Sequence, residues 1–214
     1  MPLDVMIGAL YPTRYKLPYN VRALAPVIPS GGLPDPLTAL PLATAKAHLR
    51  VIGTDQDALI TLYIGAAVGY VENYLGAPLQ AQQWRADYDR FERTFPLVGG
   101  IVSSVVSVSY LDESGATQTL TSGTDYYTNI RGTPARVTFA PTFNVPQLLD
   151  APGAVSIVYG VGYANGKIPQ AIIAALLLVV GDLFENREAS GQAANVVANP
   201  TVDNLLFPFR RVEV

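Results

Sequence analysis

Residues 169–188 read PQAIIAALLLVVGDLFENRE, an apolar segment that opens on a proline. Proline suits the first position of a helix, because its fixed φ is already helical and its missing N–H would have no partner there. Residues 171–181 carry no polar side chain on any face of such a helix. Asp182 ends the run after about half of the ~20 residues that a membrane span requires. The segment therefore predicts a helix over residues 169–188, buried on every side in the working protein.

A second helix is expected over residues 55–75. Thr54 and Asp57 have the spacing of a helix-start signature, apolar residues follow at intervals of three and four, and Gly76 marks the end. A shorter helix over residues 43–50 precedes it, closed by Gly53. We expect the long helices to pack against each other and against another subunit. The residues expected at these subunit contacts are Leu62, Tyr63, Ala66, Tyr70, Ile173, Leu177 and Phe184.

The middle of the chain changes to period-two patterning rich in β-branched and aromatic residues, which is typical of strands. An acidic, glycine-containing turn at residues 112–115 joins two of the expected strands as a hairpin. Residues 80–160 therefore predict an antiparallel β module inserted between the helices. The expected strands are residues 82–91, 102–111, 117–120, 126–129, 136–139 and 154–159.

The two ends of the chain differ from its middle. Residues 1–41 hold eight prolines, a density that disfavours helix and central strand, so we expect an extended arm laid across a partner. Residues 191–214 predict a flexible linker and an apolar tail, in which Pro208 should prevent local burial by a helix. Burying each large side chain would contribute about 1.5–3 kcal/mol. The tail residues expected to dock on a partner are Leu205, Leu206, Phe207, Phe209, Arg210 and Arg211.

Composition limits the classes of function. Half of the 214 residues are hydrophobic and 14% are charged, against about a quarter charged in ordinary domains, so neighbours should cover part of the surface. A net charge of −3 disfavours tight binding of a nucleic-acid backbone. The lack of cysteine and the single histidine exclude disulfides, thiolate zinc sites and sites with several imidazoles.

Candidate chemistry is sparse, and we predict no catalytic, cofactor or metal site. The glycine-rich residues 160–166 depart from the dinucleotide-binding spacing and are interpreted as a strand-to-helix turn. Asp87 and Asp89 could form a carboxylate pair for acid–base catalysis, but alternating arginines favour a charge-balanced strand. His48 has no second ligand nearby in sequence. Trp84 begins the β module and is interpreted as core, with a sugar-stacking platform as the alternative.

Four short segments occur in an order that resembles a known family. They are LATAKAHLRV at 42–51, YVENYLG at 70–76, YGVGY at 159–163 and LFENRE at 183–188. Together they resemble the tailed-bacteriophage head-tail connector (adaptor) family, which is also found in gene transfer agents. The resemblance covers residues 42–190 and the apolar tail. Two features depart from it, namely the long proline-rich arm and Pro41, which stands where a Ser or Thr helix cap is usual.

The resemblance implies an α+β fold: a small helical bundle with an inserted antiparallel β module, an N-terminal arm and a C-terminal tail. It implies a structural protein without cofactor that forms a closed ring, commonly twelvefold, beneath the portal. The ring would join the portal protein to stopper or tail completion proteins and let DNA pass without specific binding. It would be assembled in the host cytoplasm, away from any membrane, and would lie in the virion neck. The tail would dock on the portal.

One alternative of a different class stays open from the residues alone. A β-rich module could bind a glycan or another surface ligand through Trp84 and the tyrosines. An enzyme that uses Asp87 and Asp89 is the third hypothesis, and no substrate can be named for it.

Overall fold

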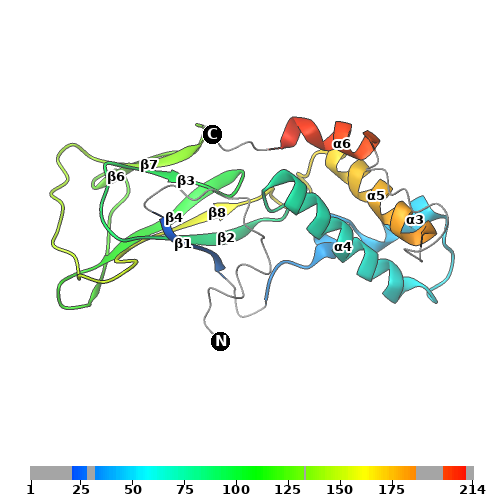
Figure 1. Cartoon of the computed structure of the whole chain (residues 1–214), viewed down its shortest axis with the longest axis horizontal. Helices are drawn as coiled ribbons and strands as arrows, with labels where there is room; N and C mark the ends of the chain where they lie inside the picture. Colours follow the sequence, from blue (N-terminus) through cyan, green and yellow to red (C-terminus); the bar gives the residue numbers. More distant parts are fainter. Residues whose placement is uncertain (1–20, 28–31, 133, 187–199, 211–214) are drawn as a thin grey trace. The chain divides into compact units, whose positions relative to one another are not determined.

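The computed structural model describes residues 21–27, 32–132, 134–186 and 200–210. It divides into two compact units (Figure 1). The β unit holds the described residues up to 33 together with residues 81–162, and the helical unit holds residues 34–80 and 163–210. The predicted α+β class, a helical bundle with an inserted antiparallel β module, is confirmed.

The predicted helices are present with adjusted ends. Helix α3 ends where Arg50 adopts a left-handed conformation (φ 56°), three residues before the expected stop at Gly53. The Thr54 side chain does not cap α4, and the Asp57 carboxylate pairs with Lys46 instead. The helices are α2 (Pro36–Ala39), α3 (Leu42–Leu49), α4 (Asp57–Leu75), α5 (Gln170–Glu185) and α6 (Pro200–Leu206), followed by the 3₁₀ helix η1 (Phe207–Phe209).

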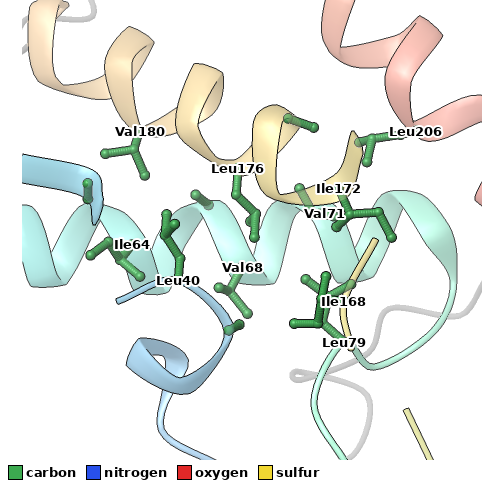
Figure 2. Packing of buried hydrophobic residues seen from close by; sticks show 14 of the residues in the cluster. Leu40, Ile64, Val68, Val71, Leu79, Ile168, Ile172, Leu176, Val180 and Leu206 are labelled. Atoms are coloured by element: carbon green, nitrogen blue, oxygen red, sulfur yellow. The ribbon is translucent and has the colours of Figure 1, made fainter. Parts of the chain in front are cut away.

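The core of the helical unit lies between α4, α5 and α6. Val71 of α4, Leu176 of α5 and Leu206 of α6 are buried in one cluster, shown in Figure 2. The buried positions of α5 follow helical spacing: Ile172, Ala175, Leu176 and Val180. The remaining apolar residues of α5 are only half-buried. In the single chain one face of α5 is fully buried, and the burial of its other sides by another subunit stays a prediction.

Helix α4 has 19 residues and a mean hydropathy of 1.2, which makes it the one helix in the described residues that could cross a membrane by length and composition. A core helix passes the same test. Its buried positions recur at intervals of three or four from Ile60 to Leu75, as expected of a helix with one face in a protein core.

A short turn of helix corrects the expected N-terminal arm. Asp35 caps α2 by accepting a hydrogen bond from the Leu37 N–H at 2.9 Å, and Pro36 occupies a position at the start of the helix where proline is tolerated. The buried Gln80 amide donates to the Asp35 carbonyl and the Thr38 hydroxyl. The prolines therefore permit a local helix here, and side-chain bonds fix it to the helical unit. Residues 1–20 of the predicted arm lie outside the described part.

The β unit consists of two antiparallel sheets. The five-stranded sheet has the order β1-β2-β8-β4-β5 and the three-stranded sheet has the order β3-β7-β6. All six expected strands are present. The bounds are β1 (Val21–Val27), β2 (Gln82–Tyr88), β3 (Thr94–Leu97), β4 (Val102–Leu111), β5 (Thr117–Thr119), β6 (Tyr126–Asn129), β7 (Ala135–Phe139) and β8 (Val155–Val161).

The two strands that the sequence analysis missed, β1 and β3, both contain a proline. Pro26 lies in β1 and Pro96 lies in β3. Each strand is at the edge of its sheet, where a missing N–H interrupts no ladder between two neighbours. In this chain, both prolines therefore lie in edge strands and do not prevent a strand from forming. Residues 21–27, part of the expected arm, form β1 and pair with β2.

Two glycines allow close packing inside the β unit. A Cβ at Gly99 (φ +99°) would come within 2.2 Å of the Trp84 ring. A Cβ at Gly160 would come within 2.6 Å of the Ser103 hydroxyl, beside the register shift between β4 and β8. Trp84 is 2% exposed and belongs to the core of the β unit, as predicted. The glycine-rich residues 160–166 form the end of β8 and a turn, which agrees with the strand-to-helix interpretation.

Leu206→Ala should lower the free energy of unfolding of the helical unit by about 2–5 kcal/mol, because it leaves a cavity in a fully buried position. Phe207→Ala is the matched control, since the neighbouring side chain is exposed and its loss should change stability by less than about 0.5 kcal/mol. Urea unfolding of the full chain, followed by the helical circular dichroism signal, measures both. Equal effects of the two substitutions would contradict the placement of α6 in the core.

Candidate assembly interface

The side of α4 that faces away from the core carries apolar residues. Leu62, Ala66 and Tyr70 follow one another at four-residue spacing and are exposed, Leu62 by 67%. We call these three residues the α4 outer stripe. Gly65 and Gly69 lie beside it, and a Cβ at either would meet no atom within 4 Å. The stripe is therefore an apolar surface that the described residues leave uncovered.

The other four residues predicted at subunit contacts lie elsewhere. Tyr63, Ile173, Leu177 and Phe184 are half-buried and pack against the core of their own helical unit. The sequence pattern did not separate them from the α4 outer stripe, because the apolar residues of α4 and α5 extend well around both helices.

The C-terminal tail packs onto the helical unit of its own chain, whereas docking on a partner was the favoured expectation. Leu206 is fully buried, and Leu205 and Phe209 pack partly against the same core. Pro208 does not prevent this, because it lies in a 3₁₀ turn that follows α6 and α6 itself buries Leu206. Phe207 alone of the four apolar residues points into solvent, with 68% of its surface exposed. Arg211 lies outside the described residues.

Contacts with α4 hold the tail in place. The Arg210 guanidinium lies 5.6 Å from the centre of the Tyr74 ring, a cation–π distance. Burial raises the pKa of the Tyr70 hydroxyl above its ordinary value, and the nearby Asp203 carboxylate and Tyr74 raise it further. Helix α6 and η1, which we call the α6–η1 corner, thus present Phe207 from a folded element.

The sequence analysis missed one exposed residue, Ile52. It is 98% exposed and lies in the loop between α3 and α4. The loop is held at both sides, because Lys46 donates a hydrogen bond to the Gly53 carbonyl and pairs with Asp57. The only available signal was a large aliphatic residue that belongs to neither predicted helix.

The carboxylates considered for catalysis have structural partners. The Arg85 Nε donates to Asp87 Oδ1 at 2.7 Å, and the Gly153 N–H donates to Asp89 Oδ1 at 2.9 Å. These contacts agree with the interpretation of a charge-balanced strand. Within the described ranges, no three His, Cys, Asp or Glu side chains come together as metal ligands would. The buried Trp84 offers no platform for a sugar, so the glycan-binding alternative loses one of the side chains on which it rested.

The predicted hairpin turn between β4 and β5 is fixed by one carboxylate. Asp112 accepts hydrogen bonds from the Ser114 N–H, the Ser114 hydroxyl, the Ala116 N–H and the Gln118 amide. The bonds from Ser114 and Gln118 lower the pKa of Asp112 to about 2. The Asp112 carboxylate therefore stays charged at the tip of the β unit throughout the neutral range.

Comparison with known proteins gives a family and a fold. Residues 40–103 match the model of the phage gp6-like head-tail connector protein family. No curated protein matches the chain. Three similar solved chains come from the neck of an empty GTA particle computed with C6 symmetry, the virion of a native gene transfer agent (GTA) particle, and the neck of a native GTA particle computed with C12 symmetry. Each is 20% identical to this chain, with TM-scores of 0.69, 0.68 and 0.68.

Each structural match extends over nearly the whole of both chains. The matches include 90%, 89% and 90% of this chain, and 97%, 96% and 97% of the three solved chains. At this identity they establish a shared fold. The fold is therefore that of the GTA neck chains, and the sequence similarity to head-tail connector proteins lies in residues 40–103. The resemblance predicted from the sequence is thereby confirmed, because residues 40–103 match the model of the connector family.

Proposed function

We propose that this chain is a ring-forming adaptor in the neck of a virion, where copies of it join the portal to stopper or tail completion proteins. The observation that carries the proposal is the match of residues 40–103, which run from the end of α2 into β4, to the connector family. The shared fold over almost the full length of a GTA neck chain supports it. We infer no catalytic activity for the protein.

The helical unit supplies surfaces suited to contacts between copies. A ring needs two different surfaces on each subunit, because its contacts are head-to-tail. The α4 outer stripe is one candidate. The parts of Ile173 and Leu177 that stay exposed beside their own core are the second candidate. Covering Leu62 alone would contribute up to about 1.5–3 kcal/mol per contact, repeated at every interface of the ring.

The low charge of the chain fits a ring through which DNA moves. A strongly basic lumen would hold the phosphate backbone by counterion release and slow its passage. The net charge of −3 avoids such binding. Burial of apolar faces between copies also explains why only 14% of the residues are charged.

Docking on the portal is assigned here to the α6–η1 corner. Phe207 is the exposed anchor, and the cationic Arg210 next to it can pair with a carboxylate of the partner. Leu206 belongs to the core in this fold, and Leu205 and Phe209 have only part of their surface left for a partner. A large aromatic residue beside an arginine is the composition that protein interfaces favour at their energetic centre.

Leu62→Asp should prevent ring formation, because each interface of the ring would bury a charge without a partner. The isolated chain should keep its fold, since Leu62 is exposed there. Leu62→Met is the matched control and should form rings normally. Negative-stain images of connectors from particles made with each variant measure the effect. Normal rings with Leu62→Asp would rule out the α4 outer stripe as a subunit contact.

Phe207→Ala should leave folding intact and reduce the joining of heads to tails at least tenfold, because the docking anchor is lost. Phe207→Leu keeps an apolar anchor and should retain most of the joining. Counting joined particles after complementation of a strain without the wild-type gene measures both variants. Truncation of the tail would not give the same information, because it also removes the buried Leu206. Wild-type joining by Phe207→Ala would refute the assignment.

A further inference from the structure

The two ends of the β unit can be told apart by their packing. At one end, the Phe91 ring lies 5.5 Å from Tyr110 of β4 and 5.2 Å from Phe139 of β7, so these strand ends meet there. At the other end, Leu97 pairs with Ala135, and the Tyr159 hydroxyl donates to the Val98 carbonyl at 2.8 Å. The β4–β5 hairpin tip lies at the first end, and the β6–β7 tip lies at the second.

Charge is distributed unequally between these ends. Residues 81–162 contain five arginines and seven carboxylates, of which Arg85 and Asp87 pair with each other. The first end carries six carboxylates against Arg90, Arg93 and Arg22 of β1, a net charge of −3, and we call it the acidic end. The second carries only Arg131 and Arg136, a net charge of +2, and we call it the basic end. The carboxylates of the acidic end are Asp89, Glu92, Asp112, Glu113, Asp125 and Asp150.

The charged groups at the tips are free to meet a partner. Arg131, Arg136, Glu113 and Asp150 are exposed, and none of them forms an ion pair with another described residue. Both ends also expose large apolar side chains. Ile130 lies in the β6–β7 tip at the basic end. Val145 lies in the loop whose Leu149 N–H bonds to the Leu111 carbonyl at the acidic end.

We propose that in the assembled ring the acidic end of the β unit of one copy contacts the basic end of the next copy. The inference rests on the proposed ring. Opposite charges at opposite ends of one unit favour head-to-tail contact, which is the geometry that closes a ring, and they oppose head-to-head contact. Two arginines on a chain of net charge −3 are too few for a nucleic-acid backbone, so a second copy is the better occupant.

The contact should depend on salt. Exposed charges are screened within about 8 Å at physiological ionic strength, so raising the salt should weaken the contact. Its contribution is mainly to the orientation and choice of partner, and apolar burial in the helical unit supplies further affinity.

Charge reversal tests the proposal with two double variants of the full chain. Arg131→Glu with Arg136→Glu makes the basic end acidic. Glu113→Lys with Asp150→Lys reverses the exposed carboxylates of the acidic tip, and leaves Asp89, Asp112 and Asp125, which hold backbone N–H groups. Each double variant should yield at least tenfold fewer rings than the wild type. The variant with all four substitutions should recover to within about threefold of the wild type, because the two substituted side chains of each tip then face substituted side chains of opposite sign at every interface.

The matched control is Arg90→Glu with Arg93→Glu, which makes the same change of charge on exposed arginines of the acidic end and should assemble normally. Urea unfolding verifies that every variant folds. Normal rings from both double variants would overturn the inference, as would a four-substitution variant no better than the double variants. These results would leave the proposed function intact if the wild type forms necks. Absence of the wild-type chain from necks would overturn the proposed function itself.

Discussion

The packing of α4 against α5 is the interaction on which the rest of the structure depends. It joins segments that lie nearly a hundred residues apart, and the intervening chain forms the β unit as an insertion between them. Helix α6 completes the core through Leu206, and Gln80 ties α2 to it. One face of each long helix packs into this core. The proposed contacts between copies therefore use the side chains on the outer faces. The division between inward and outward faces is what makes the unit suited to assembly.

Much of this arrangement could be predicted from sequence, because the spacing of apolar residues distinguishes the two kinds of element. Apolar residues alternate with polar ones in a strand and recur every three or four residues in a helix. The two long helices, α3 and six strands follow from it, as does the turn at Asp112. Proline misled the prediction at three places. Pro26 and Pro96 lie in edge strands and Pro36 at a helix start, all positions where a missing N–H has no cost in the ladder. Local patterns do not say whether a strand is at an edge, so these elements could not be recognised.

The candidate site was harder to predict than the fold. The pattern grouped the exposed Leu62, Ala66 and Tyr70 with Tyr63 and Ile173, which are half-buried beside their own core. The tail was expected to dock on a partner because Pro208 interrupts it, whereas the i, i+4 pair Val202 and Leu206 lies before the proline and is sufficient for one buried turn. Exposure of Phe207 and of Ile52 depends on tertiary packing, which no local rule supplies. The high content of apolar residues and the low content of charged residues indicated that neighbouring molecules cover part of the surface, but not which residues they cover.

Side-chain oxidation of the intact particle, compared with the isolated chain, tests the central claim that other copies cover the outer face of α4. Tyr70 is exposed in the single chain and should react readily there, whereas Trp84 is buried in either state and serves as the internal reference. The account predicts that Tyr70 is oxidised at least fivefold more slowly in the particle while the Trp84 rate is unchanged. Equal rates for Tyr70 in the two states would contradict it.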